Sequence, residues 1–199
     1  TITVEEKSAF DDLVTNIDKE TQDLLVARIK SAFPTDNILA EENDMVHNIK
    51  DGNVWVLDPI DGTVNFIVQQ DNFCVMIAYY EKGQGKFGLI YNVMADQLFY
   101  GGGQFDVYCN DKLLSPYKRR PLDRCLVGSN AAMYAKNYHG IKGFIDKTLG
   151  VRVYGGAGLS MSKVLSGQIL AYFSVIYPWD YAAASIMGKK LDYQLETIT

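Results

Sequence analysis

The sequence places two aspartates, Asp58 and Asp61, directly after an apolar run. Pro59 between them stiffens the exit from that run, and Gly62 lets the backbone turn tightly or approach a ligand closely. Two carboxylates held on such a turn can bind hard divalent cations, which prefer oxygen ligands. The backbone amides of Gly62 and Thr63 could then meet phosphate oxygens. For an isolated motif of this kind, the alternative is a type I turn in which Asp is simply a turn former.

Other acidic residues also stand next to predicted elements. Glu41 and Glu42 follow the strand-like segment 37–40. Because adjacent side chains on a strand point to opposite faces, we expect only one of the two to enter a shared site. Asp180 precedes an Ala-rich segment, where a helix dipole would keep a ligand carboxylate ionised. A helix cap is the alternative for Asp180, and also for Asp18.

The composition excludes several other classes of protein. The net charge of −5 argues against affinity for nucleic-acid polymers. The three cysteines, Cys74, Cys109 and Cys125, form no CxxC pair, and only two histidines are present, so structural zinc and a disulfide framework are not expected. The sequence shows neither a membrane-spanning apolar run nor a secretory h-region. These features predict a soluble protein of the reducing cytoplasm.

The apolar pattern predicts a layered α/β or α+β domain, in which a helix over 12–33 ends before Pro34. Two further helices are predicted over 159–165 and 181–187. The strands that we expect are 37–40, 54–57, 73–80, 87–93, 97–100, 126–129 and 151–154. We see no internal repeat and no interdomain linker. These elements must bring the acidic residues together.

Segment 83–88 formally matches the GxGxxG motif of dinucleotide-binding proteins. It lies between two strand-like runs and opens no helix, so it predicts a β-hairpin. The sequence has no P-loop and no GxSxG elbow. Haloacid dehalogenase phosphatases carry a DxDGT motif with a nucleophilic aspartate. Asp58 and Asp61 are three positions apart, so their spacing does not match that motif.

Taken together and in order, the motifs resemble those of the inositol monophosphatase family. The motifs are Asp18, Glu41-Glu42, Asp58-Pro59-Ile60-Asp61-Gly62-Thr63 and Trp179-Asp180-Tyr181-Ala182-Ala183. The resemblance runs from about Lys7 to the last residues. It implies an α/β/α/β/α sandwich with a largely antiparallel sheet, which forms one phosphatase domain over 1–199. By this resemblance, we expect the chain to lack the family's first helix and the strands that follow the helix of the Trp179-Asp180 motif, and we expect a homodimer by analogy.

The resemblance also assigns roles to residues. Glu41, Asp58 and the carbonyl of Ile60 would bind one Mg²⁺, and Asp58, Asp61 and Asp180 a second. Glu41 and Thr63 would activate the attacking water, with Asp18 supporting Thr63. Lys7 and Ser8 would belong to a loop near a third metal. The substrate-binding set that the resemblance implies is Asp61, Gly62, Thr63, Gly155, Gly156, Ala157 and Asp180. For the three residues from Gly155, a glycine turn before a helix is the alternative.

The function implied is Mg²⁺-dependent hydrolysis of a small phosphate monoester by metal-activated water, without a phosphoenzyme. By resemblance, Mn²⁺ would substitute for Mg²⁺, and Ca²⁺ and Li⁺ would inhibit. Phe173 stands where inositol-specific members often have Glu. Substrates related to inositol phosphate are therefore expected too, including fructose-1,6-bisphosphate, nucleotide 3′-phosphates and the 2′-phosphate of a dinucleotide. The alternative function is a catalytically inactive relative that binds phosphorylated ligands or a protein partner.

Overall fold

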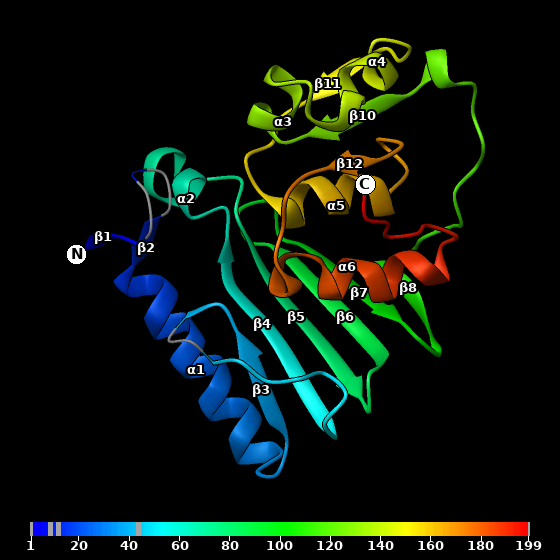
Figure 1. The fold of residues 1–199 in the computed structure, drawn as a ribbon. Coiled ribbons are helices and arrows are strands. Elements are labelled where there is room, and N and C mark those ends of the chain that lie inside the picture. Colours follow the sequence, from blue (N-terminus) through cyan, green and yellow to red (C-terminus); the bar gives the residue numbers. More distant parts are fainter. Residues whose placement is uncertain (1, 8–9, 11–12, 43–44, 199) are drawn as a thin grey trace.

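The structure is a computed structural model that describes residues 2–7, 10, 13–42 and 45–198. These residues form five layers in the order helix, sheet, helices, sheet, helices (Figure 1). The α-helices are α1 (Asn16–Ala32), α2 (Thr63–Gln69), α3 (Ala131–Ala135), α4 (Ile141–Ile145), α5 (Ala157–Leu165) and α6 (Pro178–Lys190). The layered sandwich implied by the motifs is confirmed.

Three sheets are present in the described residues. The largest has seven strands in sequence order: β3 (Asn37–Ala40), β4 (Asn53–Asp61), β5 (Cys74–Glu81), β6 (Gln84–Asn92), β7 (Gln97–Gly102), β8 (Phe105–Cys109) and β9 (Lys112–Leu113). A parallel sheet consists of β11 (Gly150–Arg152), β10 (Leu126–Ser129) and β12 (Tyr172–Phe173), and a hairpin of β1 (Val4–Glu6) and β2 (Leu13–Thr15). Only β3 and β4 run parallel in the large sheet, so their carboxyl ends lie at the same edge.

Helix α1 covers one face of the large sheet. Thr15 caps the helix, because its side chain accepts hydrogen bonds from the amides of Ile17 and Asp18. Ile29 and Leu25 pack against Leu57 of β4. The sequence pattern placed the start of this helix too early, since residues 13–15 pair with β1 instead. The cap thus places the first turn of α1 beside the edge of the sheet where β4 ends.

Helices α5 and α6 cover the other face of the large sheet. Alternate residues of β5, including Met76 and Ala78, are buried against them. A Cβ atom at Gly88 would lie 2.3 Å from the carbonyl oxygen of Ala183, so β6 and α6 approach closely only because residue 88 is glycine. This close packing fixes the first turn of α6 over the sheet.

Some details differ from the pattern-based expectations. Helix α6 begins at Pro178, so Asp180 lies inside its first turn and not before it. The sequence did not predict β1, β2, α2, α3, α4 or β12, all of which have seven residues or fewer. The hairpin expected at 83–88 is confirmed, with Glu81 opposite Gln84. Among the described residues, no helix combines the length and the apolar character needed to span a bilayer.

Candidate metal and phosphate site

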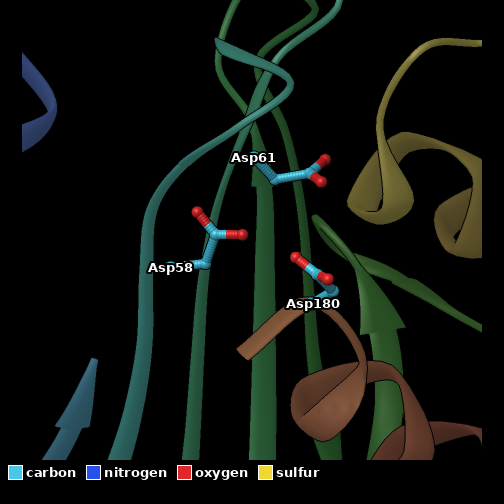
Figure 2. Close-up of side chains that lie close together, drawn as sticks. All are labelled: Asp58, Asp61 and Asp180. Atoms are coloured by element: carbon cyan, nitrogen blue, oxygen red, sulfur yellow. The ribbon is translucent and has the colours of Figure 1, made fainter. Parts of the chain in front are cut away.

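Three aspartates from two segments, β4 and the start of α6, converge near the end of β4. Each of Asp58, Asp61 and Asp180 offers a carboxylate oxygen, and these oxygens lie within 4.8 Å of one another. Figure 2 shows Asp58 and Asp61 projecting from β4 toward Asp180 at the start of α6. Oxygen ligands gathered at this spacing suit a hard divalent cation. Their roles as metal ligands remain predictions.

Asp58 carries the least compensated charge of the three. Its side chain is 1% exposed, and Oδ1 has no hydrogen-bond partner in the described part of the chain. Burial raises the pKa of Asp58 well above its ordinary value, and the charges of Glu41, Asp61 and Asp180 raise it further. A buried carboxylate without a partner is costly. A divalent cation would supply the missing partner, so the residues fit such an ion.

Asp61 is held by the start of α5. Its Oδ1 and Oδ2 accept hydrogen bonds of 2.8 Å each from the amides of Ala157 and Gly158. Burial raises the pKa of Asp61 to about 6, although these amides oppose the rise. A Cβ atom at Gly156 would lie 2.7 Å from Asp61 Oδ2, so a larger residue at this position would press on the carboxylate. Asp61 is thereby fixed with one side toward α5.

Asp180 occupies the third position of α6. Its Oδ2 accepts a hydrogen bond of 2.6 Å from the amide of Tyr177, as in a capping box. Burial raises the pKa of Asp180 to about 6, and the charge of Asp61 adds to the rise. The carboxylate therefore caps the helix and also faces the other two aspartates. The two alternatives considered for Asp180 are compatible.

The carboxylates near the end of β4 share a shift in pKa. The pKa values of Asp58, Asp61, Asp180 and Glu41 are all raised above their ordinary values. For each of them burial is the larger cause, and the repulsion between carboxylates comes second or later. The site is thus a buried acidic cluster whose ionised form needs a cation.

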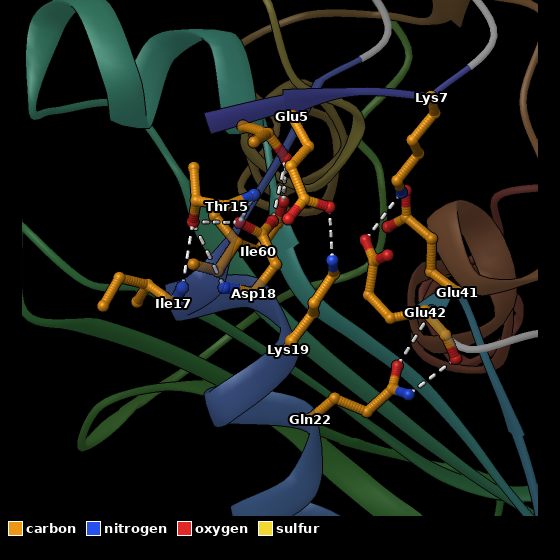
Figure 3. Close-up of polar contacts among 11 residues, drawn as sticks. Glu5, Lys7, Thr15, Ile17, Asp18, Lys19, Gln22, Glu41, Glu42 and Ile60 are labelled. Carbon is orange, nitrogen blue, oxygen red and sulfur yellow. Dashed lines mark hydrogen bonds and ion pairs between the residues drawn. The ribbon is translucent and has the colours of Figure 1, made fainter. Parts of the chain in front are cut away.

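Glu41 lies beside the three aspartates but outside their tight group. Its Oε1 is 3.0 Å from the Lys7 ammonium, which is also 2.6 Å from Glu42 Oε1 (Figure 3). Both glutamates therefore contact one lysine, and the expectation that only one of them enters the metal site stays a prediction. Burial raises the pKa of Glu41, and Lys7 opposes that rise. Of the predicted third-metal pair, Ser8 lies outside the described residues.

Thr63 and Asp18 contact each other as their predicted roles require. Thr63 Oγ1 lies 3.1 Å from Asp18 Oδ1 and 3.0 Å from the carbonyl oxygen of Ile60. Asp18 Oδ2 accepts a hydrogen bond of 2.9 Å from the amide of Thr15, so the carboxylate is locked in the cap of α1. The single proton of the hydroxyl can therefore be donated to either of two acceptors. Gly62 precedes α2 with a φ of +87°, which favours glycine.

The segment from Gly155 to Ala157 leads into α5 and also lines a cavity of about 280 Å³ beside Asp61 and Asp180. The glycine turn before a helix is therefore observed, and the substrate-binding role of this segment stays a prediction. The cavity also has neutral polar walls, which include Ser129, Asn130, Ser160, Tyr172 and Ser174. Phe173 is not among the residues that line it, and its ring packs edge-on against Phe144 with centroids 5.7 Å apart.

The sequence motifs did not identify two buried amides near the site, Gln22 and Asn65. Gln22 is 0% exposed and bonds to the backbone of Glu42. Asn65 donates from Nδ2 to the carbonyl oxygens of Asn72 and Tyr154, at 3.0 and 2.8 Å, and so ties α2 to the loop before α5. The spacing of Gln22 four residues after Asp18 was the only signal, and it is a weak one.

Comparisons with known proteins agree with the motifs. The model of the inositol monophosphatase family matches residues 1–189. The chain is 39% identical to an inositol-1-monophosphatase of Bacillus subtilis, over 99% of this chain and 77% of that protein. It is 30% identical to the Nus factor SuhB of Escherichia coli, over 90% of this chain and 69% of that protein.

A solved structure has the same fold as this chain. An IMPase/NADP phosphatase complexed with Mg²⁺ and phosphate superposes with a TM-score of 0.89, at 28% identity over 96% of this chain and 73% of that one. The family match, the relatives and the shared fold all point the same way. This chain belongs to the inositol monophosphatase family.

Proposed function

We propose that this chain hydrolyses a small phosphate monoester in a reaction that depends on Mg²⁺. The observation that supports this most strongly is the buried Oδ1 of Asp58, which has no hydrogen-bond partner among the described residues and belongs to a group of three converging aspartates. Asp58, Asp61 and Asp180 would hold one cation, and Glu41, Asp58 and the Ile60 carbonyl another. When bound, Mg²⁺ would make water a stronger nucleophile and offset the charge of the phosphate oxygens.

The residues around the aspartates would orient the attacking water. Thr63 directs its hydroxyl proton toward Asp18 or the Ile60 carbonyl, which leaves an oxygen lone pair free to accept a hydrogen bond from the attacking water. Glu41 provides a second acceptor at the same edge of the sheet. The water oxygen would bond to phosphorus as the ester P–O bond breaks, and the alcohol would leave with a proton. Phosphate and an alcohol are the products.

The cavity beside Asp61 and Asp180 would hold the alcohol part of the substrate. Its neutral polar walls, including Ser129, Asn130 and Ser174, suit a leaving group that carries hydroxyls. We therefore propose a polyol, sugar or nucleoside phosphate as the substrate. The related IMPase/NADP phosphatase shows by its name that one such site can serve more than one phosphate ester.

Release of inorganic phosphate tests this function. The chelated protein, with and without added Mg²⁺, would be compared on inositol 1-phosphate, fructose-1,6-bisphosphate, adenosine 3′,5′-bisphosphate and NADP. We expect release from at least one substrate only with Mg²⁺, and inhibition of that release by Li⁺. The same rate with and without Mg²⁺ would contradict the proposal. Trapping of an aspartyl-phosphate would also contradict it.

A second function has a specific observation in its favour. The relative SuhB is named a Nus factor, so a chain of this family can be known for a role other than hydrolysis. Binding of a protein partner without catalysis is therefore the alternative. It predicts no Mg²⁺-dependent phosphate release from any of the four substrates. The convergence of Asp58, Asp61 and Asp180 favours hydrolysis.

A further inference from the structure

Gln22 joins helix α1 to the segment that carries Glu41. The amide of Glu42 donates to Gln22 Oε1 at 2.9 Å, and Gln22 Nε2 donates to the carbonyl oxygen of Glu42 at 2.6 Å. Figure 3 shows the two bonds reaching from the helix to the backbone of Glu42. The side chain is 0% exposed, so water does not compete for these bonds. Residue 42 is therefore fixed at both of its backbone polar groups.

Among the described residues, few other backbone hydrogen bonds hold this segment. The amide of Ala40 donates to the carbonyl oxygen of Met45 at 2.9 Å, which anchors the residue before Glu41. The amide of Glu41 donates to the carbonyl oxygen of Leu57 at 3.3 Å, just beyond the last paired residues of β3 and β4. After that, the contacts of Glu41 and Glu42 to Lys7 are made by flexible side chains. Such contacts leave the backbone free to shift. Only Gln22 holds the backbone of residue 42 within the described part of the chain.

The same face of α1 also holds Thr63. Asp18 and Gln22 are four residues apart and therefore lie one turn apart on one side of the helix. Asp18 contacts the hydroxyl of Thr63, and Gln22 contacts the residue after Glu41. One rigid helix thus sets the distance between the two groups proposed to orient the attacking water.

We propose that Gln22 is a positioning residue that places Glu41 beside Asp58 and so sets the affinity for the cation these two carboxylates share. The inference rests on the proposed function. If the two hydrogen bonds from Gln22 are lost, the amide and the carbonyl of residue 42 lack these partners, and the segment must move to satisfy them. Glu41 would then move with it, while Asp61 and Asp180 keep their places on β4 and α6.

The test compares Mg²⁺ binding by calorimetry in the chelated wild type and in Gln22→Met, which keeps the volume but removes both bonds. We expect Mg²⁺ affinity to fall about tenfold or more. The control is Ile29→Ala on the same helix, which removes apolar packing from the cluster that includes Leu57 but leaves both hydrogen bonds of Gln22 intact. It should lower the melting temperature but leave Mg²⁺ affinity unchanged. Wild-type affinity in Gln22→Met would overturn the inference.

Gln22→Glu provides a second variant in case Gln22→Met does not fold. The ionised carboxylate can still accept from the Glu42 amide but cannot donate to the Glu42 carbonyl. We expect an affinity between those of the wild type and Gln22→Met, and wild-type affinity in this variant would also overturn the inference. Absence of Mg²⁺-dependent phosphate release by the wild type would be a failure of the proposed function itself. Normal wild-type release with unchanged Gln22 variants would be a failure of this inference alone.

Discussion

Two buried carboxylates at opposite ends of the same strand pair have different surroundings. Asp36 precedes β3 and is 4% exposed, and its two oxygens accept hydrogen bonds of 3.0 Å each from Asn53 Nδ2 and Trp55 Nε1. Asp58 near the carboxyl end of β4 is 1% exposed, and its Oδ1 has no partner among the described residues. Neutral donors satisfy Asp36, whereas other carboxylates surround Asp58.

The difference separates a structural role from a functional one. A buried carboxylate with hydrogen-bond donors stabilises the fold on its own. A buried carboxylate among other carboxylates destabilises the fold until a cation arrives. Asp36 therefore needs nothing beyond the protein, and Asp58 needs an ion. The predictions below test this contrast.

The largest effect is expected for Asp58→Asn. Loss of the charge shared by both proposed cation positions should lower the turnover number at least about 1,000-fold, because bound metal supplies several kcal/mol of charge stabilisation. The metal-free variant should melt at a higher temperature than the wild type, since an unfavourable buried charge is gone. Phosphate release and thermal melting in a chelator measure the two changes. A nearly normal rate would contradict the assigned role.

Thr63→Val should lower the turnover number by about 100-fold, the smaller effect typical of losing a proton-transfer partner. Valine keeps the shape of threonine but lacks the hydroxyl that contacts Asp18. Mg²⁺ affinity, measured by calorimetry, should remain close to that of the wild type. A loss of Mg²⁺ affinity as large as the loss of rate would assign Thr63 to metal binding instead.

Asp36→Asn should lower stability and leave activity unchanged, which is the opposite of what we expect for Asp58→Asn. It loses a charge-assisted hydrogen bond from Asn53 or Trp55, which costs about 1.5–3 kcal/mol of stability. The melting temperature should fall by about 5 °C. The Mg²⁺ dependence of activity should not change, because the residue lies at the other end of the strands. If Asp36→Asn were more stable than the wild type, Asp36 would not stabilise the fold, and the contrast between Asp36 and Asp58 would be wrong.

The smallest effect concerns pH. Burial raises the pKa values of Asp61 and Asp180 from 3.8 to about 6, so in the metal-free protein their contribution to stability falls as pH rises through that window. Mg²⁺ should bind the ionised carboxylates and reverse this loss. The rise in melting temperature on adding Mg²⁺ should thus be larger at about pH 7.5 than at about pH 5. An equal rise at both pH values would count against a carboxylate site.

The sequence predicted the central elements of the fold because their signals are local. The apolar run before Asp58 and the glycine turn between β5 and β6 each determine an element within a few residues. Short elements such as α2 and β12 depend on tertiary contacts instead, and periodicity cannot reveal them. The start of α6 at Pro178 was missed because a proline there looks like a boundary, although it suits the first turn of a helix.

For the candidate site, the sequence predicted which residues take part but not the contacts that hold them. The motifs named Asp58, Asp61 and Asp180, and the structure brings them within 4.8 Å of one another. The contacts that hold them come from residues far away in the sequence, such as the amide of Gly158 on Asp61. Nothing in the local sequence around Gln22 marks it as a partner of residue 42. Such pairings appear only once the chain has folded.

The most direct measurement is an anomalous difference map from a crystal of the wild-type protein soaked in Mn²⁺. If the three aspartates bind a cation, we expect a strong peak within coordination distance, about 2.2 Å, of oxygens from Asp58, Asp61 and Asp180. Asp58→Asn crystals treated in the same way should show a much weaker peak or none. Wild-type crystals whose only Mn²⁺ peaks lie away from these three aspartates would contradict the account.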